Sequence, residues 1–332
     1  MKTKNLGRTG LKVTELCLGT MTFGNQSDKK TSFQILDKAY ESGINFIDTA
    51  DAYPLGKDYQ TAGLTESIIG EWLKGKRDDF VLASKCFAPT GPGPNDMGMS
   101  RKHIMRAIDM SLKRLGTDYL DLYQIHFFDP NVPIEEMMSA FDDLVHDGKI
   151  RYVGVSNWKA WQVAKANGIA EKKDFARVAS VQPRYNLLFR MIEDELVPMA
   201  IDEGVGIISY NPLAGGMLTG RYSKNDKPQE GTRFTLGNNA GNIYQERYWQ
   251  TATFDVVNEY VAWCNEQKLD PVSVAVRWVT QQPGITSAII GASKVEQMKG
   301  SLNSAEMGDL TTEQLKWLDD LWYKLPRRRE AR

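Results

Sequence analysis

The chain has 332 residues, of which 42% are hydrophobic and 25% are charged, and its formal net charge at pH 7 is -1. This composition is typical of a soluble globular protein with a large core, and the balanced charge gives no reason to expect nucleic acid or an anionic membrane as a partner. No apolar run approaches the roughly 18 residues that a membrane-spanning helix needs.

The cysteines and the N-terminus indicate the compartment. Cys17, Cys86 and Cys264 are odd in number, widely spaced and not part of a CxxC motif. We therefore expect a reducing compartment, no disulfide framework and no metal site. Because no apolar block follows Met1–Asn5, the N-terminus does not resemble a signal peptide. These features favour a cytoplasmic protein.

Short strand candidates alternate with amphipathic helices along the chain. The strand candidates are continuous apolar runs, as expected for parallel strands that are covered on both faces. They lie at about residues 16–20, 44–48, 80–85, 121–126, 151–155, 179–182, 205–210 and 287–290. One helix is predicted between the cap Ser100 and Gly116, and another between Pro133 and Gly148. His103 and His146 fall on these helices and are expected to face solvent.

Eight strand–helix pairs in a chain of this length predict an α/β fold of the (β/α)8 TIM-barrel type. We expect a single domain over residues 1–332, with a core at about 16–303 and a C-terminal helix and tail at 304–332. A doubly wound sheet is the competing architecture, but the chain has no GxGxxG motif.

Several segments outside these pairs also have predicted places. Residues 2–14 are predicted to form a hairpin around Arg8-Thr9-Gly10 that caps the barrel bottom. The segments 50–62, 86–99 and 222–250 follow strands and are too long for tight turns. In a barrel such loops form the active-site face, so we expect them to determine substrate specificity.

Four polar residues occupy or follow strand ends in a way that predicts a reaction. Asp48, Lys85 and His126 each end a strand candidate, and Tyr53 follows Asp48 by five residues. Each residue alone also fits a structural role, such as a helix cap, an ion pair or a buried core side chain. Their joint placement is much less expected by chance, because the carboxyl ends of parallel barrel strands all meet at one mouth.

This set of side chains suits the protonation of a carbonyl oxygen. A tyrosine ordinarily has a pKa near 10 and is a poor acid at neutral pH, but a nearby ammonium such as that of Lys85 lowers the pKa of the phenol. Asp48 would keep the lysine charged, and His126 could hydrogen-bond the substrate oxygen. Side chains cannot supply hydride, so a nicotinamide cofactor is implied.

The sequence resembles the aldo-keto reductase superfamily from residue 16 to about residue 303. The resemblance rests on Asp48-Thr49-Ala50 with Tyr53, on Ala83-Ser84-Lys85 and on Tyr123-Gln124-Ile125-His126. Residues 63–66, 149–157 and 209–213 are similar to the bacterial branch that includes the potassium-channel β subunits. The resemblance implies that Tyr53 is the general acid, that Lys85 lowers its pKa, that Asp48 pairs with Lys85 and that His126 orients the carbonyl.

The resemblance also implies a cofactor site for NADPH or NADP+. It gives Ser156, Asn157 and Gln182 as contacts of the nicotinamide carboxamide, and Tyr210 as the aromatic ring that stacks on the nicotinamide. The loop that covers the pyrophosphate would contain Pro212, Leu213, Gly215, Leu218, Gly220 and Arg221. Small residues there let backbone N–H groups approach phosphate.

The adenosine 2′-phosphate site of the family corresponds to the segment after the last strand. The resemblance gives Gly291, Ser293 and Lys294 at this site and Gln297 near the adenine, and the lysine implies a preference for NADPH over NADH. This chain has Gly300-Ser301 where the family often has Glu-Asn, so one adenine contact differs.

We therefore predict an NADPH-dependent reductase of aldehydes, ketones or keto sugars that also oxidises alcohols in reverse. The alternative from a different class is a cofactor-bound regulatory or docking subunit with slow or vestigial chemistry, which the resemblance to channel β subunits allows. A barrel isomerase or hydrolase would need no nicotinamide. The sequence leaves the physiological substrate and direction, the oligomeric state and the role of residues 222–250 open.

Overall fold

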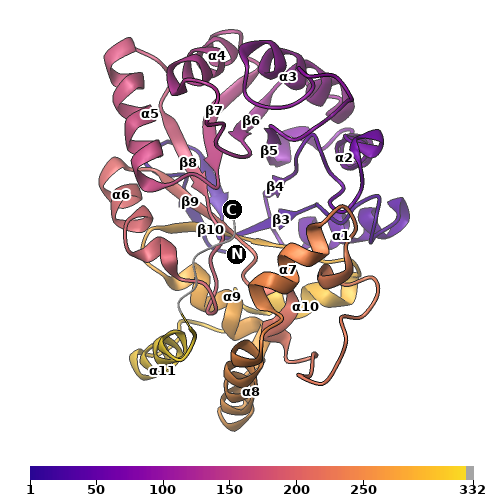
Figure 1. Cartoon of the computed structure of the whole chain (residues 1–332), viewed down its shortest axis with the longest axis vertical. Helices are drawn as coiled ribbons and strands as arrows, with labels where there is room; N and C mark the ends of the chain where they lie inside the picture. Colours follow the sequence, from indigo (N-terminus) through magenta and orange to yellow (C-terminus); the bar gives the residue numbers. More distant parts are fainter. Residues whose placement is uncertain (327–332) are drawn as a thin grey trace.

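The computed structural model describes residues 1–326, and in it eight parallel strands form a closed barrel. The strands follow one another around the barrel in chain order, and the last pairs with the first. They are β3 (Leu16–Gly19), β4 (Phe46–Asp48), β5 (Val81–Cys86), β6 (Leu120–Ile125), β7 (Ile150–Ser156), β8 (Val178–Gln182), β9 (Gly206–Tyr210) and β10 (Ile285–Ile290). Figure 1 shows helices around this ring of strands. The predicted (β/α)8 barrel is confirmed.

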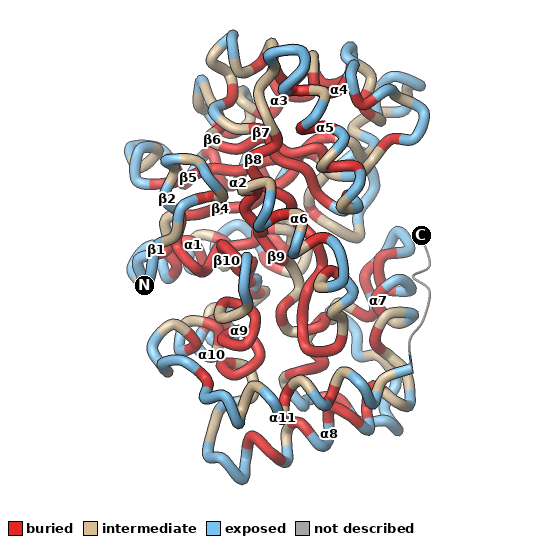
Figure 2. The backbone as a smooth tube through the Cα atoms, turned by 90° about the vertical axis from the view of Figure 1, so that its left-hand side faces the viewer, coloured by how far each residue is buried: buried red, intermediate tan, exposed pale blue. Residues whose placement is uncertain are grey.

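The helices surround the barrel, and Figure 2 shows buried backbone concentrated in the strands and on the helix faces turned toward them. The helices are α1 (Lys29–Glu41), α2 (Leu64–Trp72), α3 (Arg101–Leu115), α4 (Ile134–His146), α5 (Ala160–Lys173), α6 (Leu196–Glu203), α7 (Ala240–Tyr248), α8 (Thr251–Glu266), α9 (Pro271–Gln281), α10 (Met298–Asn303) and α11 (Thr312–Tyr323). None of the helices in residues 1–326 is long and apolar enough to cross a membrane.

Helix α3 shows how the sequence determines its ends. The Ser100 side chain accepts a hydrogen bond from the backbone N–H of His103, and Gly116 ends the helix with a φ of 66°. The expectation that His103 faces solvent is wrong, because its side chain is buried. The preceding loop covers this part of α3, where Asp96 pairs with Arg106 at 2.6 Å. His146 is exposed as expected.

The predicted N-terminal hairpin is confirmed, with β1 (Thr3–Asn5) antiparallel to β2 (Lys12–Thr14). Its turn lies against the N-terminal ends of β8 and β9, where the backbone N–H of Arg8 donates to the Gly204 carbonyl at 2.8 Å. Leu6 and Val13 are fully buried in the cluster that fills the barrel interior. In Figure 2 the hairpin and α7 lie on opposite sides of the molecule, left and right. The hairpin thus caps one end and leaves the other for a site.

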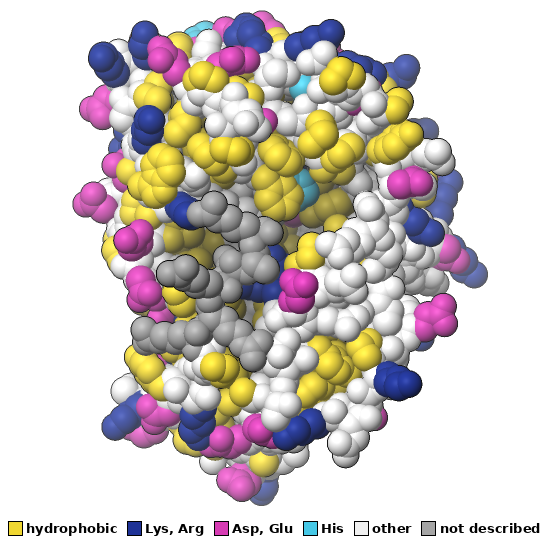
Figure 3. Space-filling view, viewed as in Figure 1, with side chains coloured by type: hydrophobic (Ala, Val, Ile, Leu, Met, Phe, Trp, Pro, Cys, Tyr) yellow, Lys and Arg dark blue, Asp and Glu magenta, His cyan; other side chains and the backbone are white. Residues whose placement is uncertain are grey.

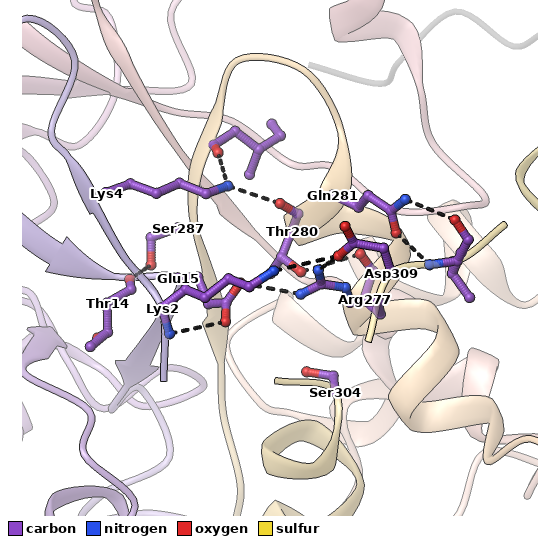
Figure 4. Close-up of polar contacts among 12 residues, drawn as sticks. Lys2, Lys4, Thr14, Glu15, Arg277, Thr280, Gln281, Ser287, Ser304 and Asp309 are labelled. Carbon is purple, nitrogen blue, oxygen red and sulfur yellow. Dashed lines mark hydrogen bonds and ion pairs between the residues drawn. The ribbon is translucent and has the colours of Figure 1, made fainter. Parts of the chain in front are cut away.

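A buried ion pair attaches this capped end to the C-terminal part of the chain (Figure 4). The Glu15 carboxylate lies 3.2 Å from Nη1 of Arg277 on α9, and both side chains are almost fully buried. Arg277 also pairs with Asp309. Nζ of Lys4 donates to the carbonyls of Thr280 at 2.9 Å and Ile285 at 2.8 Å. These contacts of Glu15 and Lys4 join segments that are 262 to 281 residues apart in sequence.

Candidate active site

The strand ends bring an ion pair to the centre of the barrel. Lys85 on β5 is fully buried, and its ammonium pairs with Oδ1 of Asp48 at the end of β4. The same ammonium donates to the Thr49 carbonyl at 2.8 Å. Oδ2 of Asp48 accepts hydrogen bonds from the amide groups of Gln124 at 2.9 Å and Gln182 at 2.8 Å. Although burial disfavours the ammonium, Asp48 and Tyr53 raise the pKa of Lys85, so it stays charged.

Tyr53 lies beside this ion pair. Its ring centroid is 5.2 Å from Nζ of Lys85. Burial raises the pKa of Tyr53, and the lowering by Lys85 does not fully offset it. The lowering of the pKa of Tyr53 that the sequence predicts comes from the lysine alone, whereas desolvation of the phenol has an opposing and larger effect. Tyr53 is therefore protonated at neutral pH and has a proton to donate.

His126 completes the predicted group of four. Its ring lies edge-on to that of Tyr53, with centroids 5.9 Å apart, and stacks on Phe127 at 4.9 Å. Burial, followed by the charge of Lys85, holds the pKa of His126 well below its usual value. The imidazole is therefore neutral. Its Nδ1 is buried without a hydrogen-bond partner among the described residues, so the ring can serve a substrate oxygen through one of its nitrogens.

A large cavity of about 1200 Å³ opens at this end of the barrel, and Asp48, Tyr53 and His126 line it. The three long loops also contribute to its wall, through Leu55, Pro89 and Ile243 among others. Two of these loops meet, since Nδ2 of Asn238 donates to the Lys57 carbonyl at 3.1 Å. Figure 3 shows a hollowed face bordered by hydrophobic side chains, with Lys or Arg atoms inside the hollow. The cavity is large enough for a substrate and part of a cofactor.

The residues predicted to contact the nicotinamide lie together in this cavity. Ser156, Asn157, Gln182 and Tyr210 all line it. The Tyr210 hydroxyl donates to Oδ1 of Asn157 at 2.8 Å, and Nδ2 of Asn157 donates to Oγ of Ser156 at 3.0 Å. Nε2 of Gln182 is directed to Asp48 and to Oε1 of Gln124 at 3.1 Å. Gln182 thus joins the predicted nicotinamide contacts to the buried ion pair.

The other predicted cofactor residues lie outside the lining of this cavity. Pro212, Leu213, Gly215, Leu218, Gly220 and Arg221 follow β9, and most of them lie in a short 3-10 helix over Ala214–Thr219 or at its ends. Gly215 and Gly216 have φ angles of 71° and 97°, a backbone that glycine adopts readily, and a side chain on Gly215 would meet Tyr244 at 2.9 Å. Glycine is therefore required at position 215 both by the positive φ and by the close packing of Tyr244.

The predicted 2′-phosphate segment follows β10. Oε1 of Gln297 accepts from the backbone N–H of Ser293 at 2.8 Å and from its hydroxyl at 3.2 Å, while Lys294 is exposed. The loop over 222–250 also reaches this segment: a side chain on Gly291 would lie 3.8 Å from Nη2 of Arg233. Gly300 is one of the two positions at which this chain differs from the family pattern. A side chain there would meet Val272 at 2.7 Å, so the close packing of α10 on α9 requires glycine.

Two polar residues at or beneath the cavity lie outside the predicted site. Gln124, which donates to Asp48, is part of a predicted motif but has no predicted role of its own, and Arg184 in the cavity wall belongs to no predicted motif. Arg184 follows Gln182 by two residues, so the period of two in an extended chain places both side chains on the same side. That spacing was the available signal. Among residues 1–326, no group of three or more acidic, histidine or cysteine side chains could hold a metal ion.

A (β/α)8 barrel with a buried lysine–aspartate pair beneath a tyrosine and a histidine is the arrangement expected of a barrel oxidoreductase. The model of the aldo/keto reductase family matches residues 15–323, so the chain belongs to this family. The family supports an oxidoreductase activity that uses a nicotinamide cofactor on small carbonyl compounds.

The chain is similar to several curated proteins over nearly its full length. It is 40% identical to an uncharacterized oxidoreductase, YrpG, of Bacillus subtilis, covering 96% of this chain and 94% of that protein. It is 36% identical to the protein Tas of Escherichia coli, covering 92% and 94%. It is also 35% identical to a probable voltage-gated potassium channel subunit beta of Arabidopsis thaliana, covering 94% and 93%.

Proposed function

We propose that this protein reduces the carbonyl group of aldehydes or ketones with NADPH and oxidises the corresponding alcohols in reverse. The observation that carries the proposal is the buried Lys85–Asp48 ion pair beneath Tyr53 and beside His126, at the wall of a cavity large enough for a substrate and part of a cofactor. Bound NADPH would supply the hydride, which no side chain can provide.

The side chains have distinct tasks in this proposal. The neutral His126 donates a hydrogen bond to the carbonyl oxygen and aligns it with Tyr53. The phenol of Tyr53 gives its proton to that oxygen as negative charge develops there. The Lys85 ammonium then stabilises the tyrosinate, and Asp48 holds the ammonium in place with help from Gln124 and Gln182.

The residues present fit the proposed cofactor. The side chains of Ser156 and Asn157 would hold the carboxamide, and the ring of Tyr210 would support the nicotinamide at the cavity wall. The glycine backbone at 215–216 would accept the pyrophosphate, and the Ser293 hydroxyl and Lys294 ammonium would hold a 2′-phosphate.

Replacing Tyr53 with Phe tests the proposed acid. The variant should bind NADPH with nearly unchanged affinity, measured by fluorescence titration, and lose most of its turnover, since only the hydroxyl is removed. Normal turnover by Tyr53→Phe would show that another group donates the proton.

Replacing Ser293 and Lys294 with Ala tests the cofactor preference. Affinity for NADPH should fall much more than affinity for NADH, because only NADPH carries the 2′-phosphate. Equal losses for both cofactors would rule out this phosphate site.

A regulatory subunit is the second candidate, favoured by the similarity to proteins named as potassium channel subunits. Such a protein would bind the cofactor tightly and reduce carbonyls slowly. The complete set of four side chains, with Asp48 and Lys85 buried and Tyr53 and His126 at the cavity wall, argues for turnover. Steady-state rates on a panel of aldehydes and keto sugars separate the two candidates.

A further inference from the structure

Gln124 is a fully buried polar side chain inside the barrel. It lies on β6, and its Nε2 donates to Oδ2 of Asp48 at 2.9 Å. Its Oε1 accepts a hydrogen bond from Nε2 of Gln182 on β8 at 3.1 Å. Gln124 therefore lies between a member of the proposed reactive group and a residue of the predicted nicotinamide site.

The neighbouring strand leaves room for this side chain. Gly154 on β7 is the parallel partner of Gln124. A Cβ on Gly154 would lie 2.8 Å from Cγ of Gln124 and 2.8 Å from Oγ of Ser180. These separations are well inside the roughly 3.5–4.0 Å at which non-bonded carbon atoms pack. Gln124 therefore keeps its position only while residue 154 has no side chain.

The Asp48 carboxylate determines how the two amide groups are oriented. An ionised carboxylate only accepts hydrogen bonds, so each glutamine must present its NH2 group to Oδ2. Nε2 of Gln182 has two protons and two acceptors, which are Asp48 at 2.8 Å and Oε1 of Gln124 at 3.1 Å. Because Gln182 lines the cavity, its Oε1 is the polar side-chain atom that remains for a ligand there. Gln182 is thus suited to a ligand that donates a hydrogen bond.

The hydrogen bonds continue from Gln182 to the other predicted nicotinamide contacts. The backbone carbonyl of Gln182 accepts from the Ser156 hydroxyl at 3.0 Å and from the backbone N–H of Asn157 at 3.1 Å. On the other side, the second carboxylate oxygen of Asp48 pairs with Lys85. An unbroken series of hydrogen bonds therefore joins this end of the predicted cofactor site to the lysine.

We propose that Gln124 is a positioning residue that fixes Gln182 and Asp48 relative to each other and so couples the carboxamide end of the cofactor site to the buried ion pair. This inference rests on the proposed function and adds a residue to that site. With both protons of its amide held, Gln182 offers a fixed acceptor to a carboxamide N–H. The second N–H donor on Oδ2 keeps Asp48 directed at Lys85, and the ammonium stays in place beside Tyr53.

A purely structural role for Gln124 is the competing explanation. The side chain would then only satisfy buried polar atoms, and its loss would lower stability without changing how the folded protein treats its ligands. The two explanations differ in two properties of the folded protein, which are its preference between cofactors and its rate of hydride transfer.

The first test measures cofactor preference in the full-length protein by isothermal titration calorimetry. It compares NADPH with its reduced 3-acetylpyridine analogue, in which a methyl ketone replaces the carboxamide and removes its N–H donors. The wild type should bind NADPH more tightly, because only NADPH can donate to Oε1 of Gln182. Gln124→Met removes the acceptor that fixes this amide and nearly keeps the side-chain volume. The variant should lose about 3- to 10-fold of the preference, the range for one neutral hydrogen bond.

The rate of hydride transfer is the second readout. Stopped-flow absorbance of NADPH with a saturating aldehyde should show a loss of about 10-fold or more in Gln124→Met, the size expected for one hydrogen bond to a charged group. The KM for the aldehyde should stay within about threefold, because Gln124 is fully buried beneath the cavity.

Gly154→Ala is a second variant, which leaves residue 124 unchanged. Its new Cβ would displace Gln124, so both readouts should move in the same direction as in Gln124→Met. The matched control is Gln281→Met. Gln281 on α9 also bonds through both ends of its amide, to the backbone of Leu310 at 3.0 and 2.8 Å, but it lies at the capped end of the barrel (Figure 4). This control should lower stability without changing either readout.

The outcomes separate this inference from the proposed function. A folded Gln124→Met variant with unchanged preference and unchanged rate would make Gln124 a structural residue and leave the reductase intact. A slower rate with an unchanged preference would connect Gln124 to Asp48 alone and overturn the coupling. If the wild type binds NADPH but reduces no aldehyde, the reductase fails, while the calorimetric preference still decides whether Gln124 fixes the cofactor contact. If Gln124→Met does not fold, the same comparison in Gly154→Ala decides the question.

Discussion

Replacing Lys85 with Met removes the charge that is proposed to stabilise the tyrosinate. The ammonium lies 5.2 Å from the ring centroid of Tyr53, and at an effective dielectric constant of about 20 this separation corresponds to roughly 3 kcal/mol, or about two orders of magnitude in rate. We expect a loss of that size in the hydride-transfer rate, measured by stopped-flow absorbance of NADPH with an aldehyde. In alcohol oxidation Tyr53 must first lose its proton, so the variant should need a higher pH than the wild type.

The control for this prediction is Lys4→Met. Lys4 is a partly buried lysine, and it donates to backbone carbonyls at the capped end of the barrel. Lys4→Met should affect stability without changing the hydride-transfer rate of the folded protein. Lys85→Met also leaves Asp48 buried without its counter-ion, so circular dichroism must confirm that the variant is folded. A folded Lys85→Met variant that binds NADPH and reacts within about threefold of the wild-type rate would refute the electrostatic reasoning.

The remaining predictions concern stability. Glu15→Gln should lower the free energy of unfolding by about 3–5 kcal/mol, because it leaves Arg277 buried without this partner. Glu259→Gln, in the exposed pair with Lys324, should lower it by at most about 1 kcal/mol. Equal effects of the two variants in urea denaturation would contradict this prediction. Gly7→Ala should cost about 1–3 kcal/mol, since φ is +57° and the new Cβ would clash with the Gly204 carbonyl oxygen. At Gly10 a Cβ would meet nothing within 4 Å, so Gly10→Ala should be tolerated. Burial, followed by the charge of Glu66, raises the pKa of Asp51 well above its usual value. The folded protein therefore binds a proton that the unfolded chain releases, and its stability falls as pH rises above about 4. Asp51→Asn should make the melting temperature depend less on pH above this value, and an unchanged pH profile would be contrary evidence.

The fold was predictable because each barrel strand carries its own local signal. A continuous apolar run marks every strand, and caps such as Ser100 and stops such as Gly116 mark the helix between two strands. The carboxyl ends of parallel strands meet at one mouth, so Asp48, Lys85 and His126 could be placed together from the sequence alone.

The features that escaped prediction depend on contacts between distant segments. The pKa of Tyr53 was expected to be lowered by Lys85, but the extent of its burial is set by loops that the sequence did not place. His103 was expected to face solvent, because the composition of the loop before its helix does not predict that this loop covers the helix. Arg184 and Arg247 are more than 60 residues apart, and only the packing of α7 over the barrel mouth brings them to one wall.

The most direct test of the central claim is a fluorescence titration of the purified protein with NADPH and with NADH, followed by the addition of aldehydes and keto sugars to the NADPH complex. We predict tight binding of NADPH, weaker binding of NADH, and oxidation of the bound NADPH by at least one carbonyl compound in the wild type but not in Tyr53→Phe. A protein that binds neither cofactor would contradict the proposed function at its first step.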